Sequence, residues 1–175
     1  MKIPTLFVRN ERDRRYVIDV ITPGCEWVFE GEGVALRMYD GVCVKKDADG
    51  EWWARYAATP TSAEWVPIRE TWRHFAAFQE AREASPTPHV GTYELCGPTI
   101  NGNPEGLSWA GLVFHNHAQR MPPWLDFPDN FVQLRREMTA PEFTFEGIVW
   151  RHRDGRMAKL KKKDFIPTRF EVQLG

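Results

Sequence analysis

The sequence predicts an α+β fold, with antiparallel sheets as the framework and helices packed outside them. Short apolar runs bounded by turn residues dominate the chain, which is typical of sheets. Two longer segments carry apolar residues at helical spacing. With 175 residues, of which 42% are hydrophobic, we expect a single domain over residues 1–175 with a packed core.

The expected strands follow one another in short steps. Residues 33–44 read as two apolar arms around the turn Tyr39-Asp40-Gly41. Further strands are expected at 51–57, 90–96, 111–115, 143–151, 156–161 and 170–174. The segment Arg153-Asp154-Gly155 reads as a hairpin turn.

Two segments predict helices. Residues 68–83 place Trp72 and Phe75 on one apolar face at helical spacing. Asp129 is a suitable N-cap for a shorter helix that runs to about Glu137.

Composition excludes several classes of protein. The formal net charge of -1 argues against nucleic-acid binding through the whole surface, so any such contact must come from a local basic patch. Cys25, Cys43 and Cys96 form no paired motif, so neither a disulfide framework nor a zinc site is expected. The chain lacks a long apolar stretch and a signal-like start, so we expect a cytoplasmic protein with no membrane partner. We also expect a monomer.

Three carboxylates stand at notable places in or beside apolar strands. Asp40 is either part of an ordinary hairpin turn or an anion at the mouth of a cleft, and Gly41 supplies backbone freedom there. Glu94 interrupts an apolar strand, and it either points to solvent or lines a site. Glu146 likewise enters an apolar strand.

Lys159 and Lys161 alternate with apolar residues, so both should lie on one face of a strand. Their ammonium groups repel each other unless an anion lies close to both. The alternative is a solvated edge strand, on which exposed lysines disfavour pairing with the edge strand of another molecule. Together with the carboxylates, the two lysines match the inventory of a metal-assisted phosphoryl-transfer site, with Mg²⁺ as the metal.

The order of these residues resembles the covalent nucleotidyltransferase superfamily of ATP-dependent ligases and mRNA capping enzymes. The first motif of that superfamily, Lys-x-Asp-Gly, corresponds to Met38-Tyr39-Asp40-Gly41. The later motifs resemble Tyr93-Glu94-Leu95, Glu146-Gly147 and Lys159-Leu160-Lys161. A narrower resemblance is to small 5′-to-3′ RNA ligases of the vertebrate RNA ligase 1 type and shorter microbial or viral relatives, through the runs at 2–5, 94–97, 101–104 and 146–150.

This resemblance implies an adenylyltransferase domain whose antiparallel sheets form the nucleotide cleft. Only residues 162–175 follow the last motif, so we expect a minimal domain without the OB domain of DNA ligases and capping enzymes. It implies ATP and Mg²⁺ (or Mn²⁺) as cofactors, and RNA ends with a 5′-phosphate and a 3′-OH as partners. The reaction would pass through lysyl-AMP and RNA-adenylate before the ends are joined.

The resemblance also implies roles for the charged residues. Asp40, Glu94 and Glu146 would hold the metal ion, and Glu94 would also touch the ribose. Lys159 and Lys161 would grip the α-phosphate, and with the metal they would lower the pKa of the nucleophilic lysine.

The remaining ATP contacts implied by the resemblance come from uncharged groups and one arginine. Arg55 matches an arginine that contacts the nucleotide, and Gly41 belongs to the first motif. The ring that stacks on adenine would be Phe114, or His115 as the second choice. His115 and His117 have strand-like spacing, but no further metal ligands are evident near them in sequence.

The chain departs from the family at its nucleophile, because Met38 stands where the lysine is expected. A thioether cannot form a stable bond to the α-phosphorus, so self-adenylylation should fail. We expect either an engineered substitution that traps ATP or a natural pseudoligase that binds nucleotide or RNA ends. Within the wider superfamily, a capping-type guanylyltransferase or a DNA ligase is a third possibility.

Overall fold

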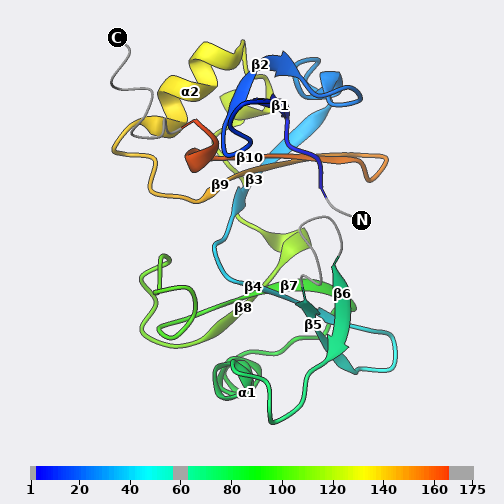
Figure 1. The fold of residues 1–175 in the computed structure, drawn as a ribbon. Coiled ribbons are helices and arrows are strands. Elements are labelled where there is room, and N and C mark those ends of the chain that lie inside the picture. The colour runs from blue at the N-terminus through cyan, green and yellow to red at the C-terminus, as the bar shows by residue number, and fades with distance from the viewer. Residues whose placement is uncertain (1–2, 57–62, 166–175) are drawn as a thin grey trace. The chain divides into compact units, whose positions relative to one another are not determined.

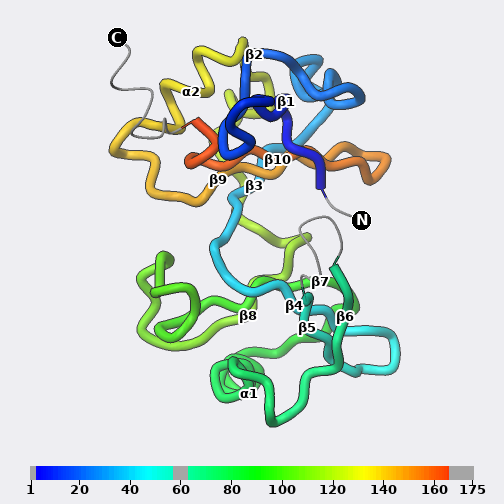
Figure 2. The backbone as a smooth tube through the Cα atoms, in the orientation of Figure 1, coloured from blue at the N-terminus to red at the C-terminus, as the bar shows by residue number. Residues whose placement is uncertain are grey.

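The computed structural model describes residues 3–56 and 63–165. The chain divides into two compact units: the terminal unit, residues 1–38 and 119–175, and the central unit, residues 39–118. The backbone leaves the terminal unit after its first sheet strand, completes the central unit, and then returns (Figure 2). Each unit has a hydrophobic core of its own.

The terminal unit contains a three-stranded antiparallel sheet in the order β10-β9-β3 and a separate two-stranded ribbon (Figure 1). The sheet consists of β3 (Gly33–Met38), β9 (Gly147–His152) and β10 (Met157–Lys161). The ribbon pairs β1 (Phe7–Arg9) with β2 (Val17–Ile21). The helices are α2 (Phe131–Thr139), η1 (Glu26–Val28), η3 (Pro123–Asp126) and η4 (Lys162–Asp164).

One face of the three-stranded sheet packs into the core of the terminal unit. Alternate residues such as Ala35, Trp150 and Leu160 are fully buried there. The buried indole of Trp150 donates a hydrogen bond of 2.7 Å to the carbonyl of Leu125, which satisfies its one polar group. The alternate positions, including Met38, Lys159 and Lys161, are only half-buried and lie on the opposite face.

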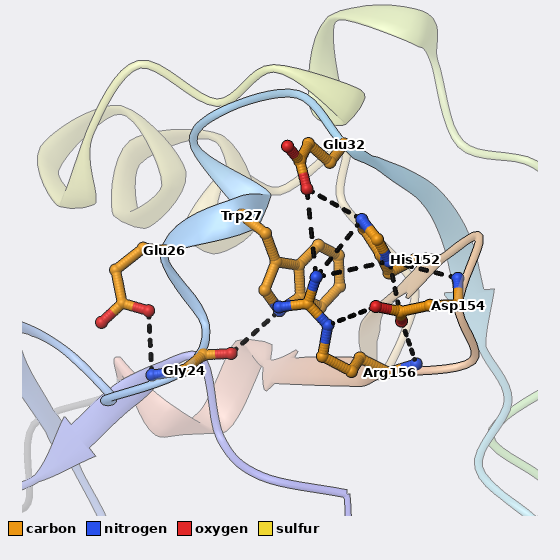
Figure 3. Close-up of polar contacts among 7 residues, drawn as sticks. All are labelled: Gly24, Glu26, Trp27, Glu32, His152, Asp154 and Arg156. Atoms are coloured by element: carbon orange, nitrogen blue, oxygen red, sulfur yellow. Dashed lines mark hydrogen bonds and ion pairs between the residues drawn. The ribbon is translucent and has the colours of Figure 1, made fainter.

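The predicted hairpin at Arg153-Asp154-Gly155 is confirmed, because β9 and β10 pair across it in antiparallel register. Gly155 has a φ of 94°, which suits glycine at this turn. Figure 3 shows the His152 ring between two carboxylates, at 2.8 Å from Glu32 and 2.7 Å from Asp154. Arg156 forms an ion pair of 2.8 Å with Asp154, so charged groups fix the turn on both of its sides.

The central unit contains a five-stranded antiparallel sheet in the order β6-β5-β4-β7-β8. Its strands are β4 (Val42–Lys46), β5 (Trp52–Tyr56), β6 (Glu64–Pro67), β7 (Gly91–Cys96) and β8 (Gly111–Phe114). The helix α1 (Phe75–Ala84) and the short helix η2 (His115–His117) complete it.

Alternation divides this sheet into two different faces. Val44, Trp52 and Leu95 are buried in a core that also contains Phe78 of α1, so α1 packs on this face. The residues between them point to the opposite face, which we call the polar face: Cys43, Lys45, Trp53, Arg55, Thr92 and Glu94.

The structure confirms the coarse prediction of an α+β protein with antiparallel sheets and two α-helices in its described part. The hairpin expected around Asp40 is wrong, because β3 and β4 belong to different sheets. The expected strand at 170–174 lies outside the described residues. Strands β1, β2 and β6 are additions that the sequence patterns do not predict.

Both α-helices begin later than expected. The N–H of Ile68 bonds to the carbonyl of Trp52, so this residue extends the sheet pairing and α1 starts only at Phe75. The cap of α2 is Asn130, not Asp129, since the Asn130 side chain accepts a hydrogen bond from the backbone N–H of Gln133 at 2.9 Å. No helix within residues 3–56 and 63–165 combines the length and the apolar character that crossing a membrane requires.

Candidate functional site

In the central unit, hydrogen bonds with the 101–107 loop hold the turn at Asp40 and Gly41, the last two residues of the first motif. The backbone N–H of Asp40 donates to Glu105 at 2.9 Å. The side-chain amide of Asn101 donates to the Asp40 carboxylate and to the Gly41 carbonyl, each at 3.0 Å. Asn103 closes the loop through two hydrogen bonds to the backbone of Leu107. The loop therefore fixes the position of the Asp40 carboxylate.

Gly41 lies against strand β7. Its backbone N–H donates to one carboxylate oxygen of Glu94 at 3.2 Å. A Cβ atom at this position would overlap the carbonyl oxygen of Leu95 and approach the Glu94 side chain. The absence of a side chain at Gly41 thus permits the contact that links the motif turn to Glu94.

Glu94 and His115 are brought together on the polar face. The second carboxylate oxygen of Glu94 lies 2.9 Å from Nε2 of His115. The other ring nitrogen, Nδ1, lies 2.9 Å from the hydroxyl of Thr92. Both ring nitrogens are therefore engaged, and the imidazole has a defined orientation.

Cys43 lies directly opposite Glu94 in the register of β4 and β7. Burial, and secondarily the charge of Glu94, raises the pKa of the Cys43 thiol to about 12, whereas the charge of Arg55 acts in the opposite direction. Arg55 therefore lies close enough to influence this group, as its place on the polar face requires. The sequence predicts no role for Cys43, and the only signal for it is the alternation along β4.

Phe114 is not brought together with Glu94. It pairs with Tyr93 in the strand register and packs against the Tyr93 ring at 4.9 Å, on the α1 side of the sheet. His89 stacks on it at 4.9 Å with an interplanar angle of 14°. Of the two expected adenine-stacking rings, His115 is the one beside the carboxylate, although its ring edge is used by Glu94.

The two histidines at 115 and 117 are arranged differently from what their spacing predicts. They lie in a short 3-10 helix, not on one face of a strand. His117 contacts the rings of His89 and Phe114. His115 instead meets Glu94, and Cys43 contributes a third ligand atom within 4.8 Å. Cys43 and Glu94 come from other strands, so the sequence around His115 gives no sign of them.

In the terminal unit, Met38, Gly147 and Lys161 form one row across the sheet. Gly147 of β9 pairs with Met38 on one side and with Lys161 on the other. Residues directly opposite one another point to the same face, so Met38 and Lys161 share it. A Cβ atom on Gly147 would overlap the Leu160 carbonyl oxygen, so the close approach of β10 requires glycine at this position.

Lys159 lies in the next row of the same face, opposite Val149, which also pairs with Leu36. The predicted same-face arrangement of Lys159 and Lys161 is confirmed. The Lys161 ammonium contacts the carboxylate of Glu146, which precedes β9. An anion thus lies beside Lys161.

The outer edge of β10 is paired as well. The backbone N–H of Lys159 donates to Pro4 at 3.0 Å, and its carbonyl accepts from Leu6 at 2.7 Å. The solvated edge strand considered for the two lysines is therefore not what the structure contains at Lys159. The backbone N–H of Lys161 donates to the Asp164 carboxylate at 2.8 Å, and this hydrogen bond caps the start of η4.

The predicted site residues thus form two groups, one in each unit. Asp40, Gly41, Arg55, Glu94 and His115 belong to the central unit, whereas Met38, Glu146, Lys159 and Lys161 belong to the terminal unit. Comparison with protein-family models gives no match, and no curated protein has a significantly similar sequence.

Proposed function

We propose that this chain has the architecture of an ATP-dependent RNA ligase that joins 5′-phosphate and 3′-OH ends, and that Met38 blocks its first step. The observation that carries this proposal is the row Met38, Gly147, Lys161. An amine at position 38 would emerge on the same sheet face as Lys159 and Lys161, with no side chain between it and Lys161.

The charges on that face suit the first reaction. A nucleophilic lysine must lose its proton, and like charge from Lys159 and Lys161 lowers the pKa of such an amine. The same ammonium groups would stabilise negative charge on the α-phosphate during transfer. The contact of Lys161 with Glu146 keeps its ammonium group in place before the nucleotide binds.

The central unit contains carboxylates that could bind a metal ion and an arginine that could contact a nucleotide. Asp40 and Glu94 present carboxylate oxygens, which are the ligands Mg²⁺ prefers. Bound Mg²⁺ would neutralise phosphate charge. Backbone and amide donors fix both central-unit carboxylates, and Arg55 supplies a cation for a phosphate or ribose.

The proposed reaction has three steps. An amine nitrogen at position 38 would attack the α-phosphorus, the bond to the β-phosphate oxygen would break, and pyrophosphate would leave. The AMP group would then pass to the oxygen of an RNA 5′-phosphate, which frees the amine. Finally, a 3′-hydroxyl would attack that 5′-phosphorus and AMP would leave. Met38 cannot perform the first step because its thioether has no proton to lose.

The test is a Met38→Lys variant incubated with α-phosphate-labelled ATP and Mg²⁺. We expect one labelled AMP per chain, in an acid-labile and base-stable bond to nitrogen. Leu36→Lys is a matched control, because it adds a lysine to the same face one row away. The proposal fails if Met38→Lys gains no label while it retains the circular dichroism of the parent, or if both variants are labelled equally.

Met38 itself favours a second candidate, a pseudoligase that binds nucleotide or RNA ends without catalysis. Calorimetric titration of the unaltered chain with ATP, GTP, and 5′-phosphorylated RNA or DNA separates the candidate functions. A ligase of RNA should prefer ATP and RNA ends, a capping enzyme GTP, and a DNA ligase DNA ends. A pseudoligase should bind its ligand and stay inactive even when lysine is restored at position 38.

A further inference from the structure

A set of three different metal-binding groups lies on the polar face of the central unit. Among the described residues, Cys43, Glu94 and His115 offer one sulfur, one oxygen and one nitrogen atom that all lie within 4.8 Å of one another. All three side chains are half-buried. This combination is distinct from a cluster of acidic residues, because soft, borderline and hard donors converge at one point.

The sheet register creates this convergence. Cys43 of β4 pairs directly with Glu94 of β7, so their side chains project side by side on one face. In the pairing of β7 with β8, Tyr93 lies opposite Phe114, so the chain leaves β8 with His115 next to Thr92. The three ligand atoms therefore come from three adjacent strands or their ends.

Neighbouring groups orient two of the three ligands. One Glu94 oxygen accepts the Gly41 N–H at 3.2 Å, which leaves the other oxygen directed at His115. Nδ1 of His115 lies 2.9 Å from the Thr92 hydroxyl, which leaves Nε2 directed at Glu94. Such a hydrogen bond on the remote ring nitrogen is the usual support of a metal-binding histidine.

We propose that Cys43, Glu94 and His115 bind a borderline-soft divalent cation of the Zn²⁺ class, with a fourth position left for water or another small ligand. Zn²⁺ binds thiolate, imidazole and carboxylate at about 2.0–2.3 Å, which places tetrahedral ligand atoms roughly 3.3–3.8 Å apart. The Glu94–His115 contact of 2.9 Å must therefore open by less than about 1 Å. The sulfur and nitrogen donors of this set select against Mg²⁺, which prefers oxygen ligands, so a Mg²⁺ ion held by Glu94 would not use Cys43 or His115.

Metal binding has a simple proton balance. The Cys43 thiol releases its proton to water as the sulfur–metal bond forms. The His115 ring stays neutral, with its proton on Nδ1 donated to the Thr92 hydroxyl and its Nε2 lone pair on the metal. A divalent cation also neutralises the Glu94 charge that stands beside the sulfur, so the thiolate becomes stable in the occupied site.

This inference does not depend on ligase chemistry, and its test uses metal binding alone. Titration of the unaltered chain with Co²⁺ under reducing conditions should give a sulfur-to-cobalt charge-transfer absorption that saturates at one Co²⁺ per chain. Zn²⁺ should abolish the absorption and Mg²⁺ in excess should not. Absence of this absorption in the folded chain would overturn the proposal.

Variants test the ligand assignment. Cys43→Ser should lose the charge-transfer absorption, whereas Cys25→Ser, at a buried cysteine of the terminal unit, should keep it. Thr92→Val should retain the absorption but weaken Zn²⁺ affinity about 10–100-fold, as loss of a supporting hydrogen bond does. If Cys43→Ser fails to fold, His115→Gln takes its place, and unchanged cobalt affinity in that variant would refute the site.

Discussion

Met38 and Lys161 lie on opposite sides of the same residue, Gly147, in one row of the terminal sheet. Neighbouring strands are about 4.8 Å apart, so roughly 10 Å separates the two backbones across the row. The extended side chains of a lysine and of Lys161 are long enough to reach a common phosphate from these positions. If a lysine at position 38 reaches the same phosphate as Lys161, replacing either lysine alone should slow adenylyl transfer.

In a Met38→Lys background, replacement of Lys159 or Lys161 by alanine should slow the transfer of AMP to protein about 10²–10³-fold. Losses of this size follow the removal of one group that stabilises transition-state charge. The measurement is the single-turnover rate of labelling from α-phosphate-labelled ATP. Lys163→Ala is the control, since Lys163 is exposed in η4. Equal rates in all three alanine variants would remove Lys159 and Lys161 from the reaction.

The unaltered chain should seal RNA that already carries AMP on its 5′-phosphate, with Mg²⁺ and without ATP. The final step breaks the bond to AMP and forms the RNA phosphodiester, and it does not use the residue at position 38. Denaturing gel electrophoresis of a labelled strand would show the joined product. Glu94→Gln should reduce sealing. No sealing by the unaltered chain and by Met38→Lys alike would contradict ligase chemistry and favour a binding role.

Local patterns predict the hairpin of β9 and β10 and the shared face of Lys159 and Lys161. A turn residue such as Gly155 and a period of two residues are properties of short segments, so the sequence expresses them directly. The separation of β3 from β4 is not visible in this way. The run at 33–44 has the apolar pattern of a hairpin, and only pairing with distant strands sends its two arms into different sheets.

The sequence predicts which residues belong to the candidate site better than it predicts which of them lie close together. Asp40 and Glu94 stand out as charged residues in or beside apolar strands, whereas only the family resemblance points to Arg55. The proximity of Cys43 and His115 to Glu94 depends on register between strands far apart in sequence. The same register sends Phe114 to the face that α1 covers. A shift of one residue along β8 would exchange these two rings, and no local pattern fixes that choice.

Gly41→Ala should destabilise the central unit by about 1–3 kcal/mol, the usual cost of extra volume at a tightly packed position. The new methyl group would overlap the Leu95 carbonyl oxygen and push the backbone away from Glu94. Urea unfolding followed by tryptophan fluorescence measures the change. Gly111→Ala is a matched control in β8, because a Cβ atom there meets nothing within 4 Å. Equal stability of the two variants would show that β7 leaves enough room for a side chain at position 41.

The turn between β9 and β10 should lose stability in acid. The Arg156 backbone N–H, followed by side-chain hydrogen bonds from His152 and Arg156, lowers the pKa of Asp154 to about 2. A carboxyl whose pKa is lower in the folded chain than its usual value of about 3.9 stabilises the fold above that value, and this contribution disappears as pH falls toward 2. We therefore expect Asp154→Asn to lower the thermal unfolding midpoint at pH 6 and to have a smaller effect at pH 2.5. Asp49→Asn, at the exposed turn before β5, should change the midpoint little at either pH. An Asp154→Asn effect that is the same at both pH values would mean that the carboxylate charge does not stabilise this turn.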